Sequence, residues 1–227
     1  MHRIDAPFSY RRKAPLRRLI GAAALVAAAL SLASCGTPGE TGSAAVEETD
    51  DVVTPGPLGD RSLGSANAPV VVVEYASLTC PYCRNFHEKV FPRLKRTYID
   101  TGKVRYVVRE FPIGRSAGNA AIINRCAPAS QYFQLYGLFL THQREWVSQE
   151  VRLDAIYGVA KRIGMSRATF DKCLANQSMI DALDEVKQRG RRLGVKGTPT
   201  FFVNGQKAQG AVSYDEIKAM IESKGST

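Results

Sequence analysis

Two cysteines stand three positions apart in Cys80-Pro81-Tyr82-Cys83, and their spacing could support redox chemistry. The pair follows an apolar run at 70–76 and opens a segment with helical spacing. A thiol at the start of a helix lies near backbone N–H groups without intrahelical partners and near the positive end of the helix dipole, and both favour the thiolate. Pro81 suits the first helical position because its φ is already fixed. The spacing therefore predicts dithiol–disulfide exchange.

The two thiols are expected to play different roles. We expect Cys80, at the helix cap, to be the nucleophile, and Cys83, one turn further in, to resolve the mixed disulfide. We expect Pro81 and Tyr82 to tune the redox properties of the pair and to contact the substrate. Two other interpretations of the pair stay open, namely half of a zinc site and an incidental pair. Because the sequence shows no further ligands near these cysteines, neither a metal nor another cofactor is expected.

Alternating strands and helices must position this pair. Apolar runs, helical periodicity and turn residues mark the elements. In chain order we expect a strand at 70–76, a helix from Pro81 with a kink at Pro92, a strand at 103–109, a block of helices over about 116–192, strands at 200–203 and 206–210 around an Asn204-Gly205 turn, and a last helix ending near Glu222.

Several helix ends in the second half of the chain carry local signals. Ser178 with Asp181, and Ser213 with Glu216, have the spacing of capping boxes and predict two helix starts. Gly164 predicts a helix end, because glycine readily adopts the left-handed conformation there.

Residues 1–35 read as an export signal. A basic start is followed by an apolar stretch of 15 residues at 19–33, which is short for a membrane span and suits a signal peptide. The segment 32–36, with small residues before Cys35, resembles the lipobox of bacterial lipoproteins. This resemblance implies that Cys35 is lipidated and becomes the mature N-terminus. The alternative is ordinary cleavage nearby, which would leave Cys35 as a free thiol.

Charge divides the rest of the chain into two parts. Residues 36–60 carry six acids and no lysine or arginine, with few large apolar groups. Such a segment cannot bury enough surface to order itself, so we expect a flexible acidic tether. The remaining domain, 61–227, carries a net charge of +11. The tether could instead fold back on this basic domain. No nucleic-acid motif accompanies the positive charge, so no nucleic-acid partner is expected.

Three segments in this order resemble the DsbA family of thiol–disulfide oxidoreductases. They are the cysteine pair behind a strand that carries Glu74, the Arg-Glu-Phe-Pro sequence at 109–112, and the segment 194–205 around Pro199. The resemblance covers about 60–225. It implies an α/β, thioredoxin-like fold with an inserted all-helical subdomain at about 116–192.

The resemblance also implies roles for residues outside the cysteine pair. Pro199 looks like the cis-proline that faces the dithiol in thioredoxin folds, and the backbone of Thr198 would pair with an extended client. Glu74 would be a buried acid that relays protons to the inner thiol. The alternatives are an ordinary trans proline and an edge-strand glutamate that reaches solvent. We expect His87 to be a plain surface histidine.

Cys126 and Cys173 remain as a second pair within the helical block. Two such cysteines in an exported domain most often form a structural disulfide. A second redox pair is the alternative, although neither cysteine has a Cys-x-x-Cys neighbour.

The sequence therefore predicts a lipid-anchored enzyme on the periplasmic or cell-surface side of a membrane. It would oxidise dithiols of reduced or unfolded exported proteins, and a membrane redox partner would reoxidise it. Tyr82 stands where the best-known strong oxidant of the family has histidine, which favours a milder oxidant. A disulfide isomerase or reductase with the same site is the alternative enzyme, and a redox-gated binding module or chaperone is the alternative without turnover.

Overall fold

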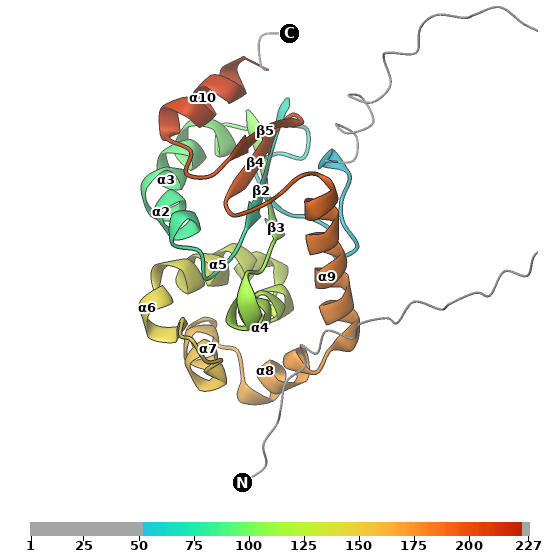
Figure 1. Cartoon of the computed structure of the whole chain (residues 1–227). Coiled ribbons are helices and arrows are strands. Elements are labelled where there is room, and N and C mark those ends of the chain that lie inside the picture. Colours follow the sequence, from blue (N-terminus) through green and yellow to red (C-terminus); the bar gives the residue numbers. More distant parts are fainter. Residues whose placement is uncertain (1–51, 224–227) are drawn as a thin grey trace, which may run out of the picture.

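Five strands form a mixed sheet in the order β1-β3-β2-β4-β5 at the centre of the molecule (Figure 1). The computed structural model describes residues 52–223. The central strand β2 is parallel to β3 and antiparallel to β4, and both edge strands run antiparallel to their neighbours. The bounds are β1 (Arg61–Leu63), β2 (Val70–Ala76), β3 (Val104–Glu110), β4 (Thr200–Val203) and β5 (Gln206–Gln209).

The near-continuous apolar run of β2 reflects burial on both faces of the sheet. Val72 and Glu74 point to one face, and Val73 and Tyr75 point to the other, because successive side chains alternate. In Figure 1, α2, α3 and α10 lie on one side of the sheet and α9 lies on the other. The cysteine pair at the end of β2 is therefore placed by a strand that cannot shift without disturbing two cores.

The helices between β3 and β4 form the predicted all-helical insertion, and α4 to α8 gather at one end of the sheet (Figure 1). The described helices in chain order are α2 (Pro81–Lys89), α3 (Phe91–Leu94), η1 (Lys95–Ile99), α4 (Gly114–Cys126), η2 (Ala129–Gln131), α5 (Tyr132–Thr141), α6 (Gln143–Trp146), α7 (Leu153–Ala160), η3 (Lys161–Ile163), α8 (Arg167–Leu174), α9 (Gln177–Arg192) and α10 (Tyr214–Glu222).

Most predicted element ends are confirmed. The helix from Pro81 breaks at Val90, and Pro92 lies in the first turn of α3, where its missing N–H needs no partner. Gly164 adopts a φ of 83° at the end of η3. Ser213 and Glu216 form a capping box at the start of α10.

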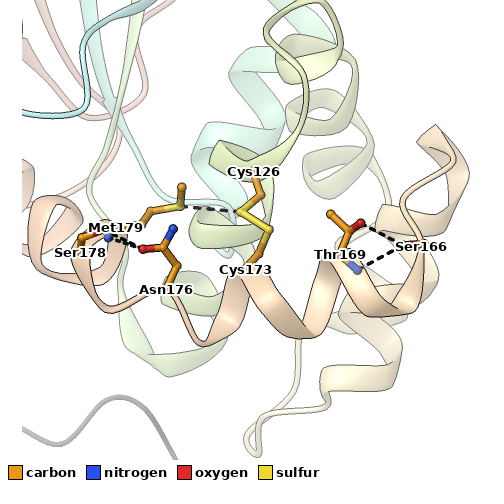
Figure 2. Close-up of a disulfide and its surroundings, with 7 residues drawn as sticks. All are labelled: Cys126, Ser166, Thr169, Cys173, Asn176, Ser178 and Met179. Atoms are coloured by element: carbon orange, nitrogen blue, oxygen red, sulfur yellow. Dashed lines mark hydrogen bonds between the residues drawn. A yellow bond between two sulfur atoms is a disulfide. The ribbon is translucent and has the colours of Figure 1, made fainter.

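The predicted capping box of Ser178 and Asp181 is wrong. Asn176 caps α9 instead, with its Oδ1 accepting from the N–H of Met179 at 3.1 Å and from the hydroxyl of Ser178 at 2.8 Å (Figure 2). Asp181 accepts from the side chain of Gln177 at 2.8 Å. The helix starts earlier because asparagine is at least as good a cap as serine and lies closer to the end of α8.

The acidic tether predicted for 36–60 is wrong at its C-terminal end, because residues from Val52 onward pack on the domain. Val52 is 1% exposed. The buried guanidinium of Arg109 donates to the carbonyl oxygens of Val52 at 2.7 Å and Thr54 at 2.8 Å, and it pairs with Asp60 at 3.1 Å. A buried arginine needs several acceptors, and this segment supplies them. Asp60 thus brings one acid of the segment back onto the basic domain.

The expectations for the rest of the N-terminal region lie outside the described residues. They are the signal peptide at 1–35, lipidation at Cys35 and the tether over 36–51. Within residues 52–223, none of the helices combines the length and the apolar character that crossing a bilayer requires.

A disulfide joins Cys126, at the end of α4, to Cys173 in α8, as predicted (Figure 2). The two Cα atoms are 6.2 Å apart, and 47 positions separate the residues in sequence. Met179 packs against the bond, with its sulfur 3.9 Å from the Cys126 sulfur. The disulfide fixes the crossing of two helices within the insertion.

Candidate active site

Cys80 is the N-cap of α2, as the sequence predicted. Its backbone is extended, with φ −77° and ψ 122°, and its Sγ accepts from the N–H of Cys83 at 3.4 Å. Pro81 occupies the first turn. Both cysteines are free thiols and buried, whereas Tyr82 is 61% exposed. The sulfur of Cys80 therefore lies at the helix end, where backbone N–H groups stabilise negative charge.

The loop before β4 brings Thr198 and Pro199 to the cysteine pair. The Thr198–Pro199 peptide bond is cis, as predicted. In its thiol form, Cys80 donates to the carbonyl oxygen of Thr198 over 3.1 Å. The Thr198 hydroxyl is buried and has no hydrogen-bond partner within residues 52–223, and the Thr198 side chain stabilises the Cys80 thiolate.

These contacts lower the pKa of Cys80 from 9.0 to about 6. The hydrogen bond from the Cys83 side chain is the largest cause, and it outweighs the burial that opposes ionisation. The Thr198 side chain and the backbone N–H groups of Cys83 and Tyr82 lower the pKa further. Cys80 is thus mainly a thiolate at neutral pH, which is the form that attacks and that leaves.

The pKa of Cys83 moves in the opposite direction, far above its usual value. Complete burial is the main cause, followed by the hydrogen bond to Cys80 and the negative charge of Glu74. A proton must therefore be taken from Cys83 before its sulfur can attack a mixed disulfide. The division into nucleophile and resolving thiol stays a prediction, which the position of Cys80 at the helix end and the complete burial of Cys83 support.

Glu74 is 1% exposed, so the alternative of an edge glutamate that reaches solvent is wrong. Its strand is central, and the side chain lies on the same face as Val72 and the α2 core. Burial raises its pKa from 4.5 to about 8, the hydrogen bond from Tyr106 opposes this rise, and the Cys80 charge adds to it. Glu74 can therefore exchange a proton near neutral pH, as a relay requires.

Tyr106 is a site residue that sequence reasoning missed. Its hydroxyl donates to Oε2 of Glu74. In the parallel register of β2 and β3, Glu74 is opposite Val108, and Tyr106 lies two positions earlier on the same face. The alternation within strand 103–109 shows which of its side chains share a face. Only the register between the two strands shows that Tyr106 lies beside Glu74.

Gln143 also escaped the sequence analysis, because α6 was not predicted. Its side-chain amide donates to the carbonyl oxygens of Leu78 at 2.8 Å and Cys80 at 3.0 Å. A buried glutamine thus ties the start of α2 to the helical insertion.

The expectation that His87 is a surface histidine is wrong. The ring is half-buried, stacked on Phe91 at 5.4 Å between centroids and met edge-on by Tyr136 at 5.9 Å. Burial lowers the pKa of His87. The reason is that α5 of the insertion packs over α2, which no local pattern reveals.

An exposed apolar residue, Ile113, is tied to the loop before the cysteine pair, and a pocket lies beyond it. Ile113 is 50% exposed, and its backbone is held by Ser77 and Thr79 from the loop before Cys80. Beyond it is a pocket of about 340 Å³ between the start of α4 and α9, lined by Pro112, Gly114, Arg115, Gly118, Leu183, Asp184 and Lys187. Among residues 52–223, no group of three or more histidine, cysteine, aspartate or glutamate side chains is placed to hold a metal.

Comparison with known proteins agrees with this geometry. Residues 58–223 match the sequence model of the Thioredoxin family. A Rickettsia conorii relative, provisionally named a protein-disulfide oxidoreductase, is 34% identical over 72% of this chain and 59% of its own length. A Bacillus anthracis relative, provisionally named disulfide bond formation protein D, is 31% identical over 71% of this chain and 76% of its own length. The chain thus spans about three fifths of the Rickettsia relative.

Solved structures share the arrangement. Alpha-DsbA1 of Wolbachia pipientis superposes with a TM-score of 0.72 at 28% identity, covering 78% of this chain and 96% of its own. BdbD of Bacillus subtilis shares the fold, with a TM-score of 0.68 at 23% identity over 75% of this chain and 95% of its own. The chain belongs to the thioredoxin family and, within it, to the DsbA-like thiol–disulfide oxidoreductases.

Proposed function

We propose that this protein oxidises paired thiols of exported proteins by thiol–disulfide exchange at Cys80 and Cys83. The observation that carries the proposal is the placement of the two thiols: Cys80 caps α2 and accepts from the N–H of Cys83 at 3.4 Å, whereas Cys83 is completely buried, so their pKa values move in opposite directions. A stabilised Cys80 thiolate is a good leaving group, so the Cys80–Cys83 disulfide is readily reduced and acts as an oxidant.

The reaction follows from these assignments. A client thiolate attacks Sγ of Cys80 in the disulfide form, and Cys83 leaves with the electron pair and is protonated. The second client thiolate then attacks the client sulfur of the mixed disulfide, and Cys80 leaves as a thiolate. The client loses two electrons and two protons, and the enzyme ends as a dithiol. Glu74 gives and takes the proton of Cys83.

Client binding falls on the surface around Cys80. We propose that the backbone of Thr198, next to Pro199, pairs with an extended client segment. The exposed side chains of Pro81 and Tyr82 supply apolar contacts beside the reacting sulfur. A membrane redox partner that accepts two electrons from the dithiol would restore the disulfide.

Refolding of reduced, unfolded ribonuclease tests the direction of exchange. Catalysed disulfide formation by the oxidised protein, lost in Cys80→Ser, is the expected result. Rescue of scrambled ribonuclease without catalysed oxidation would assign the site to an isomerase. Inactivity in both assays, with ribonuclease bound, would assign the protein to the redox-gated binding modules.

The location is proposed from the sequence before residue 52. We propose that Cys35 is lipidated and holds the domain on the outer side of a membrane. Radiolabelled fatty acid supplied to expressing cells should label the full chain but not Cys35→Ser. Label in both proteins, or in neither, would overturn the lipid anchor and leave the exchange chemistry untouched.

A further inference from the structure

A buried polar cluster lies beneath the cysteine pair, on the face of the sheet that α2 covers. Its centre is Glu74, which is 1% exposed, with Tyr106, which is 2% exposed. The Tyr106 hydroxyl donates to Oε2 of Glu74. The ring of Tyr106 packs against Phe91 with centroids 5.0 Å apart, so the phenol is held by packing as well as by its hydrogen bond.

The two carboxylate oxygens of Glu74 differ in their surroundings. Oε2 is occupied by Tyr106, whereas Oε1 is buried without a hydrogen-bond partner among residues 52–223. The Tyr136 hydroxyl is likewise buried without a partner in that part of the chain. The titratable groups that interact with this carboxylate are Cys80 at the N-cap of α2, Cys83 in α2, Tyr106 in β3 and Tyr136 in α5.

A tyrosine is suited to the position beside a relay acid. Burial and the charge of Glu74 raise the pKa of Tyr106 well above 10, so the phenol stays a donor over the working range. A neutral donor stabilises a carboxylate less than a cation would. The pKa of Glu74 therefore stays high enough for the acid to gain and lose a proton near neutral pH.

We propose that Tyr106 is a positioning residue that fixes Oε2 of Glu74 and reserves Oε1 for proton exchange with Cys83. The inference rests on the proposed exchange function. When Cys83 resolves a mixed disulfide, its S–H proton goes to Oε1, its sulfur bonds to Cys80, and the partner sulfur leaves with the electron pair. In the reverse direction the proton returns to Cys83 as that thiolate leaves.

Tyr106→Phe tests the proposal because the substitution removes the donor and keeps the ring. Without the donor the carboxylate is less stable, so the acid binds its proton more tightly. The midpoint of the pH dependence of the resolving rate should rise by about one pH unit. The rate at pH 7 should therefore be about tenfold lower than in wild type. The step can be followed by stopped flow, as release of glutathione from a mixed disulfide on Cys80.

Two further variants separate positioning from a structural role. Tyr98→Phe removes another largely buried hydroxyl that donates to a carboxylate, that of Glu222 at 2.7 Å, and should leave the profile unchanged. In a Glu74→Gln background, Tyr106→Phe should add no further shift, because Tyr106 acts through Glu74. A profile of Tyr106→Phe that superimposes on wild type, or an added shift in that background, would overturn the proposal.

A measurement on the wild-type protein keeps the test open if Tyr106→Phe fails to fold. With ¹³C-labelled tyrosine, the Cζ resonance of Tyr106 should titrate with a midpoint near 8 and lose this transition in Glu74→Gln. A flat resonance in wild type overturns the pairing. Failure of wild type to release glutathione would instead refute the exchange function, so the two failures are distinguishable.

Discussion

The sulfur of Cys80 lies 3.1 Å from the carbonyl oxygen of Thr198, a residue 118 positions further along the chain. The contact exists because β2 and β4 are neighbours, so the loop after one strand meets the loop before the other. The same threonine carries a buried hydroxyl with no hydrogen-bond partner in the described chain, and its side chain lowers the pKa of Cys80. One residue thus faces both forms of Cys80, with a carbonyl for the thiol and a hydroxyl for the thiolate.

Replacing Thr198 with valine should raise the pKa of Cys80. Thr198→Val keeps the shape and the backbone carbonyl but removes the hydroxyl that stabilises the thiolate. Because Cys83 remains the larger cause, the midpoint should rise from near 6 by about one unit or less. The pH dependence of iodoacetamide reaction with the reduced protein measures the midpoint.

Thr101→Val is a suitable control, since its hydroxyl bonds only to carbonyls of its own helical turn. The control should keep the wild-type midpoint. An unchanged midpoint in Thr198→Val would show that the helix end and Cys83 suffice to stabilise the thiolate.

Glu74→Gln should stabilise the folded protein at neutral pH while slowing the resolving step. The pKa of Glu74 is about 8 in the folded protein and 4.5 for an ordinary glutamate, so the acid favours the fold below pH 4.5 and loses this advantage as pH rises through 8. Removing the titration should therefore raise the free energy of unfolding at pH 7 by about 3 kcal/mol.

Urea unfolding of wild type and Glu74→Gln between pH 4 and 8 measures this difference, which should vanish near pH 4. Glu88→Gln, at an exposed position of α2, is the control that removes a carboxylate outside the buried cluster. Equal stability of wild type and Glu74→Gln at pH 7 would contradict the high pKa of the buried acid.

Local sequence features were enough to predict those site residues that lie within continuous motifs. Cys80, Cys83 and Pro199 stand in motifs whose neighbours define the strand-to-helix turn and the loop. Tyr106 depends on the register between β2 and β3, which no single strand contains. Gln143 reaches Cys80 from a four-residue helix that is too short to give a periodic pattern.

The same distinction applies to the fold. The β-branched run at 70–76 and the Asn204-Gly205 turn are local signals, and both predictions are confirmed. The edge strand β1 has only three residues, and it is held in the sheet by pairing with β3. Residues 52–60 have the composition of a tether, yet they are packed because the acceptors for Arg109 lie in them. The composition of a segment does not show whether a residue elsewhere in the chain, such as Arg109, will bind it.

Asp60→Ala should destabilise the domain strongly. Asp60 and Arg109 are both buried, with side chains 3% and 2% exposed. Removing the carboxylate leaves the guanidinium buried without its charge partner, which should lower the free energy of unfolding by about 3–5 kcal/mol. Chemical denaturation measures the change.

The matched control is Asp100→Ala, which removes an ion pair with Lys95 whose side chains are 48% and 42% exposed. Its effect should stay below about 1 kcal/mol. If the two variants lose similar stability, the segment 52–60 does not depend on the buried pair.

The double variant Cys126→Ser/Cys173→Ser should lose stability but keep the chemistry of the site. Opening a loop with a sequence separation of 47 should lower the free energy of unfolding by about 4 kcal/mol in the chain-entropy estimate. The groups that set the pKa of Cys80 are Cys83, Thr198 and the backbone of α2, none of which contacts this disulfide. Iodoacetamide titration should therefore still give a midpoint near 6, and a shifted midpoint would mean that the insertion controls the site through α4 and α8.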